Sequence, residues 1–294
     1  MRFGLVPLEF ASAVDRIIVD GAPDFSRFNL VEIVRDALQT EHISVIEVSM
    51  DIAHIIPGAL TSKTIAQLAE LKEEFGHSYT VHLPFWSLEL ASFNEPVRKG
   101  SVESIVESIR LAKPLEPECY VLHSTGPLAA EFSRLNFSKT IVNVICMSMA
   151  RFSARSVEEI LTQTEIAPHR IAVENVEFPF EITRSIIDEY DLSICFDTGH
   201  LLTKYSGDES VFEFYREHRN RITELHLNDG TYKEVEGVPI HEDHLALGTG
   251  ELPVREFLQE LLKDNFDGPM IFELTNEEVR QSLQMIKDVV PTAL

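Results

Sequence analysis

The stretch 192–200 combines a short apolar run with two side chains that commonly bind metal ions. The run at 192–196 is rich in strand-forming residues, and a short apolar run is typical of a parallel strand covered on both faces. Asp197 would then stand at the carboxyl end of this strand. Gly199 would let the chain turn, so that His200 points over the same end. A carboxylate and an imidazole at such a place indicate metal ligation, because an unpaired ionised Asp is costly to bury.

The same pair allows a simpler interpretation, in which Asp197 caps the following helix and His200 is incidental. The rest of the chain favours the metal interpretation, because further Asp, Glu and His side chains stand at the ends of strand-like runs or in the loops that follow them. They are His82, His123, Glu174, His226, Glu242, His244 and Glu273. Together with Asp197 and His200, they predict a metal centre.

Strand-like runs alternate with helical patterns along the chain. We predict eight strands, at 3–6, 43–48, 79–83, 119–122, 171–173, 193–196, 222–227 and 270–272. Between them apolar residues recur with a period near 3.6, as in the stripe that follows Pro253. This alternation predicts an α/β fold, a closed (β/α)8 TIM barrel that forms one domain over residues 1–294. The alternative is an open doubly wound sheet, but no G-x-G-x-x-G motif follows the first run.

A barrel of this kind carries its active site at the carboxyl ends of its strands, where the candidate ligands would meet. Cys119, Cys146 and Cys195 form no C-x-x-C pair. A disulfide framework or a thiolate zinc site is therefore not expected. We expect a metal ion held by nitrogen and oxygen atoms.

The charge balance is strongly acidic, with 48 Asp and Glu against 25 Lys and Arg and a formal net charge of -23. We expect no strong binding to nucleic acid, because Lys and Arg contacts to phosphates supply most of that affinity. No apolar run approaches the roughly 18 residues of a membrane span, and the first residues lead into a strand rather than a signal peptide. These features predict a cytoplasmic protein that does not enter membranes.

The candidate residues, taken in order, resemble the xylose-isomerase-like TIM barrel superfamily, which includes sugar isomerases and epimerases and the abasic-site endonuclease IV branch. The resemblance covers essentially the whole chain. Its motifs are His82, His123, Glu174, Asp197 with His200, His226-Leu-Asn-Asp, Glu242-x-His244 and Glu273.

In the endonuclease branch such a site holds three ions, usually zinc. For this chain we expect one to three divalent ions, zinc or alternatively manganese. The resemblance implies that His82 and His123 hold one ion with Glu174. Glu174 would bridge to a second ion, which Asp197, His226 and Glu273 complete. A third ion would be held by His200, Glu242 and His244. The chain departs from the branch at Glu242, where the branch has Asp.

The isomerase branch typically uses one divalent ion, at the residues that correspond here to Glu174, Asp197, His226 and Glu273. The two glutamates would be catalytic and move protons on either side of a substrate carbon. In that branch His82, His123 and Glu242 would have no ion to hold. Their presence favours a hydrolytic site with several ions, in which a metal activates water and neutralises the leaving oxygen.

Isolated cations in the predicted loops suit a small molecule with one or two phosphates, and we predict substrate binding by Arg98, Lys204 and Lys233. Trp86 lies in an apolar loop, 82–94, that would cover a bulky ligand. The segment 81–94 also resembles cobamide-remodelling phosphodiesterases. The sequence thus predicts a metal-dependent hydrolase of a small-molecule phosphoester. A sugar or sugar-phosphate isomerase or epimerase is the alternative, and a non-catalytic binding barrel is a third class. The sequence does not predict the oligomeric state.

Overall fold

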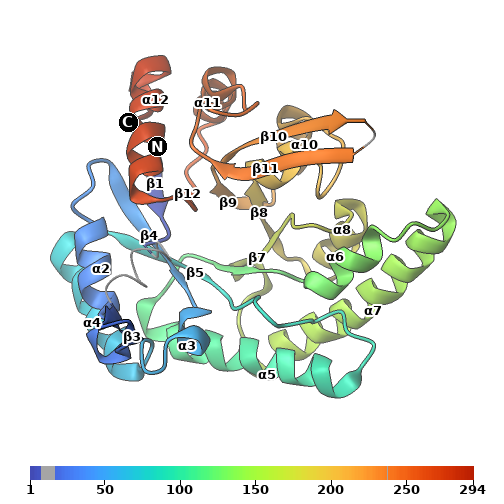
Figure 1. Ribbon diagram of the computed structural model, residues 1–294, viewed down its shortest axis with the longest axis horizontal. Helices are drawn as coiled ribbons and strands as arrows, with labels where there is room; N and C mark the ends of the chain where they lie inside the picture. The colour runs from blue at the N-terminus through green and yellow to red at the C-terminus, as the bar shows by residue number, and fades with distance from the viewer. Residues whose placement is uncertain (8–16, 237) are drawn as a thin grey trace.

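The computed structural model describes residues 1–7, 17–236 and 238–294 and forms a closed barrel surrounded by helices (Figure 1). The barrel strands are all parallel, and their order around the barrel is β1, β12, β9, β8, β7, β6, β5 and β4. Their bounds are β1 (Arg2–Leu5), β4 (Ile43–Ser49), β5 (Ser78–His82), β6 (Tyr120–Leu122), β7 (Ile171–Glu174), β8 (Ser193–Asp197), β9 (Ile222–His226) and β12 (Pro269–Phe272). Each end lies within one residue of the prediction, and the (β/α)8 barrel is confirmed.

Helices connect successive strands on the outside of the barrel. They are α2 (Leu30–Ala37), α3 (Ile52–Ile55), α4 (Ser62–Phe75), α5 (Glu95–Ala112), α6 (Pro127–Ser133), α7 (Lys139–Thr164), α8 (Phe180–Tyr190), α9 (Thr198–Leu202), α10 (Val211–His218), α11 (Val254–Lys263) and α12 (Asn276–Val289). Short 3-10 helices lie at Phe25–Arg27, Lys113–Leu115, Pro168–Arg170 and Pro291–Ala293.

Local sequence signals explain where several helices begin and which face they bury. Ser210 and Glu213 form a capping box at the start of α10, and Thr275 and Glu278 do the same for α12. Each box satisfies backbone N–H groups that have no partner within the helix. The stripe of α11 packs inward through Val254, Phe257, Leu258 and Leu261, as its period predicts.

The strands are covered on both faces, as is usual in parallel sheets. All five residues of β8 and all four residues of β12 are buried. Outside the barrel, Phe196 of β8 stacks on Phe214 of α10 with ring centroids 4.4 Å apart. The strands are thus fixed between the barrel interior and the helices, and so are the side chains at their carboxyl ends.

A hairpin interrupts the seventh βα unit, where the sequence predicted a loop. β10 (Asp229–Val235) and β11 (Val238–Leu245) pair antiparallel and project from the barrel near α10 (Figure 1). Most of their residues are exposed or half-buried, so the apolar alternation that marks a strand against a core is weak. A smaller hairpin, β2 (Ile18–Val19) with β3 (Ala22–Pro23), follows β1.

Candidate metal centre

The predicted ligands gather at the carboxyl end of the barrel. His82, Glu174, Asp197 and His226 are the last residues of β5, β7, β8 and β9, and His123 and Glu273 directly follow β6 and β12. Parallel strands bring these ends to one rim of the barrel. Among the described residues, the donor atoms form three overlapping groups at this rim, namely His82 with His123 and Glu174; Glu174 with Asp197, His226 and Glu273; and Asp197 with His200 and His244.

Glu174 joins two histidines in the first group. Its Oε2 lies 2.8 Å from His123 Nε2 and 3.3 Å from His82 Nε2, and Glu174 is 1% exposed. The Nδ1–H of His82 donates to the Leu83 carbonyl at 2.9 Å. A neutral His82 would therefore turn a lone pair toward a carboxylate, which requires a proton or a cation between them. Burial lowers the pKa of His82, but hydrogen bonding to Glu174 and nearby carboxylates outweigh it and raise the pKa to about 9.

The second group surrounds Nδ1 of His226. This atom lies 3.0 Å from Glu273 Oε2, 3.5 Å from Glu174 Oε1 and 3.8 Å from Asp197 Oδ2. It is buried and makes no hydrogen bond. Burial raises the pKa of the Glu273 carboxyl, yet the charge and close approach of His226 and the hydrogen bond with His244 hold it well below its usual range. Several ionised carboxylates around an orphaned imidazole nitrogen fit a divalent cation.

The third group lies above Asp197. His200 Nδ1 is 3.1 Å from Glu174 Oε1 and 3.9 Å from Asp197 Oδ1, and it too is buried without a hydrogen bond. His244 Nε2 lies 4.0 Å from Asp197 Oδ2 and 3.1 Å from Glu273 Oε2. His200 and His244 thus reach the same carboxylates as the second group.

The structure does not bring Glu242 to this group. Glu242 is exposed on β11, whereas Asp243 lies with its carboxylate 3.8 Å from His200 Nε2 and 3.4 Å from His244 Nδ1. Side chains alternate along a strand, so Glu242 faces the side opposite to its neighbours His241 and Asp243. The alternation breaks at His244, whose φ of 51° is left-handed, and this residue turns back to the site. His241 and Asp243 face Tyr205 and His200, and Glu242 faces away. Asp243 is therefore the acidic neighbour of the third group.

Two asparagines that the sequence analysis did not single out hold the carboxylates in place. Asn228 donates to Asp197 Oδ2 at 2.9 Å, and its carbonyl oxygen accepts the Glu273 backbone N–H at 3.2 Å. Asn175 exchanges two hydrogen bonds with the backbone of Asp197, at 2.7 and 2.9 Å. Both asparagines directly follow or nearly follow a ligand in sequence, Asn175 after Glu174 and Asn228 after His226-Leu227. This position next to a predicted ligand is the sequence feature from which the role of the two asparagines could have been predicted.

The predicted substrate residues fall into two classes. Arg98 is a correction, because its side chain is fully buried and pairs with Glu95 at 2.8 Å and Glu159 at 2.7 Å. It ties α5 to α7 and is unavailable to a substrate, although its place after the third predicted strand indicated a loop. Trp86 is 50% exposed in the loop after β5, and Lys204 and Lys233 are exposed. Substrate binding by these three remains a prediction.

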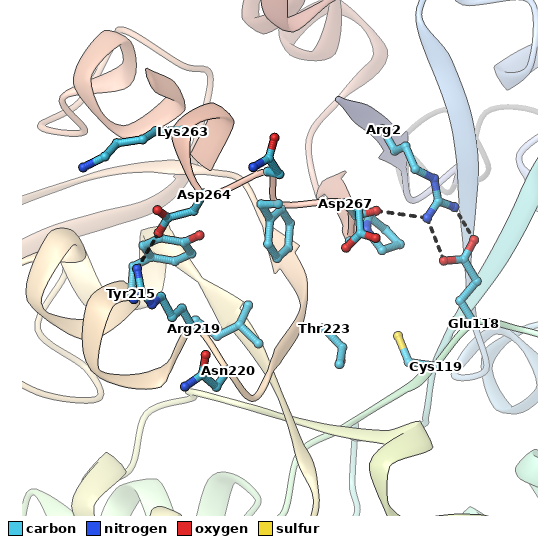
Figure 2. Close-up of a pocket in the computed structure, with 15 residues that line it drawn as sticks. Arg2, Glu118, Cys119, Tyr215, Arg219, Asn220, Thr223, Lys263, Asp264 and Asp267 are labelled. Atoms are coloured by element: carbon cyan, nitrogen blue, oxygen red, sulfur yellow. Dashed lines mark hydrogen bonds and ion pairs between the residues drawn. The ribbon is translucent and has the colours of Figure 1, made fainter. Parts of the chain in front are cut away.

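A cavity of about 710 Å³ opens at the opposite, amino end of the barrel (Figure 2). It is lined by the first residues of β1, β9 and β12 and by Cys119. Figure 2 shows Arg2 bonded to Glu118 across its rim, and Arg219 is paired with Asp264 at 2.9 Å. Both arginines are thus paired with carboxylates. None of the candidate metal ligands, all of which the structure describes, lines this cavity, so the candidate chemistry lies at the carboxyl end.

Comparison with known proteins agrees with this architecture. The profile of the family described as xylose isomerase-like TIM barrel matches residues 36–289. The chain belongs to this family. An uncharacterized protein of Methanocaldococcus jannaschii is 29% identical over 239 residues, which are 76% of this chain and 73% of that protein.

Two solved structures illustrate the range of xylose isomerase-like barrels. A D-tagatose 3-epimerase-like protein superposes with a TM-score of 0.71 at 23% identity, and the match covers 100% of this chain and 98% of that one. Endonuclease IV from Thermus thermophilus superposes with a TM-score of 0.65 at 20% identity, over 99% of this chain and 100% of that one. At these identities the likeness shows the fold alone.

In the part of the chain that the structure describes, none of the helices combines the length and the apolar character that a membrane span requires.

Proposed function

We propose that this xylose isomerase-like barrel is a metal-dependent hydrolase that cleaves a small-molecule phosphoester or phosphodiester. The observation that carries the proposal is the approach of His82 and His123 to Glu174 Oε2, at 3.3 and 2.8 Å. A one-ion isomerase would use only the group around His226. The two further histidines supply donors for an additional ion, on a carboxylate that the second group already shares.

The donor set suits divalent ions of the zinc or manganese type, because it consists of imidazole nitrogens and carboxylate oxygens. Bound ions would lower the pKa of water from 15.7 toward about 7 and neutralise charge on a phosphoryl group. His82, His123 and Glu174 would hold one ion, and Asp197, His226 and Glu273 would complete the site of a second with Glu174. His200 and His244 would hold a third with Asp197.

Glu273 is the most accessible carboxylate of the second group. Its side chain is 20% exposed, whereas those of Glu174 and Asp197 are 1% and 0% exposed. Its Oε2 accepts a hydrogen bond from His244 at 3.1 Å when that imidazole is protonated at Nε2. Glu273 would thus be the catalytic carboxylate that a substrate or water molecule at the site can reach, and Glu174 would be shared by two ions.

The surroundings of the site favour a bulky organic substrate over duplex DNA. Large apolar side chains are exposed on the loops and the hairpin that follow β5, β6 and β9, namely Trp86, Phe137, Val238 and Ile240, at 50%, 60%, 60% and 51%. A groove of about 950 Å³ lies beside α7 and α8, and the ring of Tyr205 in its wall is 6.2 Å from that of His200. Its charged lining consists of Lys139 and Lys204 together with Glu181, Asp208, Glu209 and Glu213. A cobamide nucleotide loop joins a phosphodiester to large apolar parts and is the specific substrate that we propose.

The second candidate is sugar or sugar-phosphate isomerisation or epimerisation. It is favoured by the completeness of the second group, in which Glu174 and Glu273 both approach His226 Nδ1, at 3.5 and 3.0 Å. Two such glutamates can remove a proton from a substrate carbon and return it.

The double variant His82→Ala, His123→Ala separates the two candidates. Turnover is measured on a panel of phosphodiesters that includes a cobamide and on a panel of ketoses and aldoses, and bound metal is counted. We expect phosphodiester cleavage to fall on the order of 10³-fold, with the ion at His226 retained. His54→Ala, an exposed histidine of α3, is the control and should change neither quantity. Sugar interconversion that survives the double change, without phosphodiester cleavage in the parent protein, would select the isomerase.

A further inference from the structure

The layer of the barrel interior beneath the metal centre is polar. Glu47 of β4, Thr80 of β5 and Glu224 of β9 are each 0% exposed, and Cys119, just before β6, is 3% exposed. Barrel interiors of this fold are usually filled by branched apolar side chains. Two carboxyl groups in such a place need specific partners, because a buried polar atom without one is destabilising.

Glu224 has its partners within the layer. Its Oε2 accepts the Cys119 thiol at 2.5 Å, and its Oε1 accepts the Thr80 hydroxyl at 3.0 Å. The Thr80 hydroxyl is also 3.4 Å from Glu47 Oε2, a longer and weaker contact. Glu47 Oε1 has no hydrogen bond at all. The layer therefore satisfies Glu224 and leaves one oxygen of Glu47 open.

That open oxygen faces His226. Glu47 Oε1 lies 3.4 Å from His226 Nε2, and both residues are 0% exposed. His226 Nε2 likewise has no hydrogen bond. The separation is a few tenths of an ångström longer than a usual N–H···O bond. A small movement of either side chain would satisfy both atoms at once. The Cys195 thiol of β8 is the other polar neighbour of His226, and it is a weak hydrogen-bonding group.

The two nitrogens of His226 thus face different surroundings. Nδ1 faces the carboxylates of the metal centre, and Nε2 faces Glu47. A neutral imidazole carries one proton. A proton on Nδ1 would occupy the metal-binding lone pair and turn the Nε2 lone pair toward a carboxylate. A proton on Nε2 satisfies Glu47 and leaves Nδ1 free for an ion.

We propose that Glu47 is a positioning residue, which accepts the Nε2–H of His226 and thereby holds the Nδ1 lone pair toward the metal ion. The inference rests on the metal-dependent function only in that His226 binds an ion. Carboxylates behind a metal-binding histidine fix its tautomer and orientation, and their loss typically costs about 10–100-fold in metal affinity.

The first arm of the test needs neither metal nor a variant. Burial lowers the pKa of His226 in the metal-free protein, but nearby carboxylates outweigh it and raise the pKa. Above that pKa, where the ring is neutral, NMR of ¹⁵N-labelled histidine reports which nitrogen of His226 carries the single proton. We expect the proton on Nε2, protected from exchange with solvent. A proton on Nδ1 would overturn the proposal. This arm is informative even if the protein proves not to be a hydrolase, so the two proposals can fail separately.

The second arm compares Glu47→Gln with Glu224→Gln, which makes the same chemical change at an equally buried carboxylate in the same layer. Zinc affinity is measured by competition with a chelator. We expect Glu47→Gln to weaken one bound zinc by about tenfold or more and to increase the Nδ1–H tautomer, since an amide can donate to Nε2. Glu224→Gln should leave both readouts close to the parent protein.

Two results of the second arm would overturn the proposal. Equal losses in both variants would indicate a general packing role for the layer. The disappearance of one whole ion, with affinity at Nδ1 unchanged, would indicate that Glu47, Glu224 and His226 hold a cation of their own, since their donor atoms also lie within 4.8 Å of one another.

Discussion

Asp197 uses its two carboxylate oxygens for different tasks. Oδ1 accepts the His200 backbone N–H at 2.6 Å and caps α9, while Oδ2 accepts from Asn228 and lies 3.8 Å from His226 Nδ1. The capping bond sets the turn that brings His200 over the strand end. The helix-cap interpretation and the metal interpretation of the sequence are therefore compatible, because each oxygen serves one of them.

At the same scale, the ligands at strand ends could be predicted from sequence, but the acidic neighbour on the hairpin could not. Glu174, Asp197 and His226 end buried strands, whose apolar runs mark them clearly. Glu242 and Asp243 are adjacent, and which of them approaches His200 depends on which side of β11 points toward the barrel. The side of the hairpin to which a side chain points depends on the register of the two strands. In a half-exposed hairpin, the pattern of apolar residues does not determine that register.

The different positions of Asp243 and Glu242 predict different effects of their substitution on metal binding. Asp243→Asn should weaken binding of the third ion, because it removes a negative charge 3.8 Å from His200 and 3.4 Å from His244. Glu242→Gln, at the exposed neighbour, should leave ion binding unchanged. The measurement is metal content and zinc affinity of the two variants. A loss in Glu242→Gln with none in Asp243→Asn would restore Glu242 as the ligand.

At the scale of elements, α5 and α7 are joined through a buried cation. Arg98 on α5 reaches Ser156 at 3.0 Å and Glu159 at 2.7 Å, both on α7. Ser156 in turn donates to the Leu90 carbonyl at 2.7 Å, so the bond network also fixes the loop after β5. A sequence cannot reveal such a role easily, since a lone Arg after a strand also suits a substrate.

We therefore predict that Arg98→Met lowers the free energy of unfolding by about 2 kcal/mol or more, the typical cost of breaking a buried charged hydrogen-bond network. Turnover of the remaining folded protein should be nearly unchanged. Lys99→Met is the control, because Lys99 is the adjacent cation and its side chain is 64% exposed. Denaturant unfolding and KM provide the measurements. A large rise in KM at unchanged stability would instead return Arg98 to the substrate site.

The junction between α4 and β5 contains a buried histidine outside the metal centre. His77 is 5% exposed, and its ring makes an edge contact with Tyr79, with ring centroids 4.5 Å apart. Burial, followed by the charge of Lys72, lowers its pKa to about 4. Between pH 6.5 and 4 the unfolded chain binds a proton at this site that the folded chain does not. Stability is therefore lost as the pH falls through this window.

His77→Phe keeps the ring and removes this proton. We predict that the variant gains stability relative to the parent as the pH falls from 6.5 to 4, and that the difference levels off below about 4. Taking the difference cancels the titration of all other groups. Unfolding curves at several pH values measure it, and NMR titration measures the pKa directly. An imidazole of His77 that titrates near 6.5 would contradict this account.

At the scale of the whole molecule, the acidic balance limits the substrates that the barrel can attract. The net charge of -23 opposes duplex DNA, whose binding gains affinity from cations that meet phosphates. We predict weak binding to abasic duplex at about 0.15 M salt and no incision at an enzyme-like rate. Gel-shift and incision assays test this. Rapid incision would show that the site acts on DNA in spite of the overall charge.

The barrel itself could be predicted almost completely from sequence, because eight buried strands and their connecting helices follow regular periods. The reaction could not, since the xylose isomerase-like fold supports both epimerases and endonuclease IV. The difference between these chemistries lies in how many ions a few side chains hold. That number is a property of the site rather than of the fold.

Elemental analysis of the parent protein and of Glu174→Gln tests the central claim most directly. Glu174 belongs to two of the donor groups, so a neutral amide there should weaken both. We predict two to three divalent ions per parent chain and the loss of at least one in the variant, with the barrel still folded and turnover reduced at least about 100-fold. A single ion per parent chain, retained in Glu174→Gln, would contradict the multinuclear site and the hydrolase built on it.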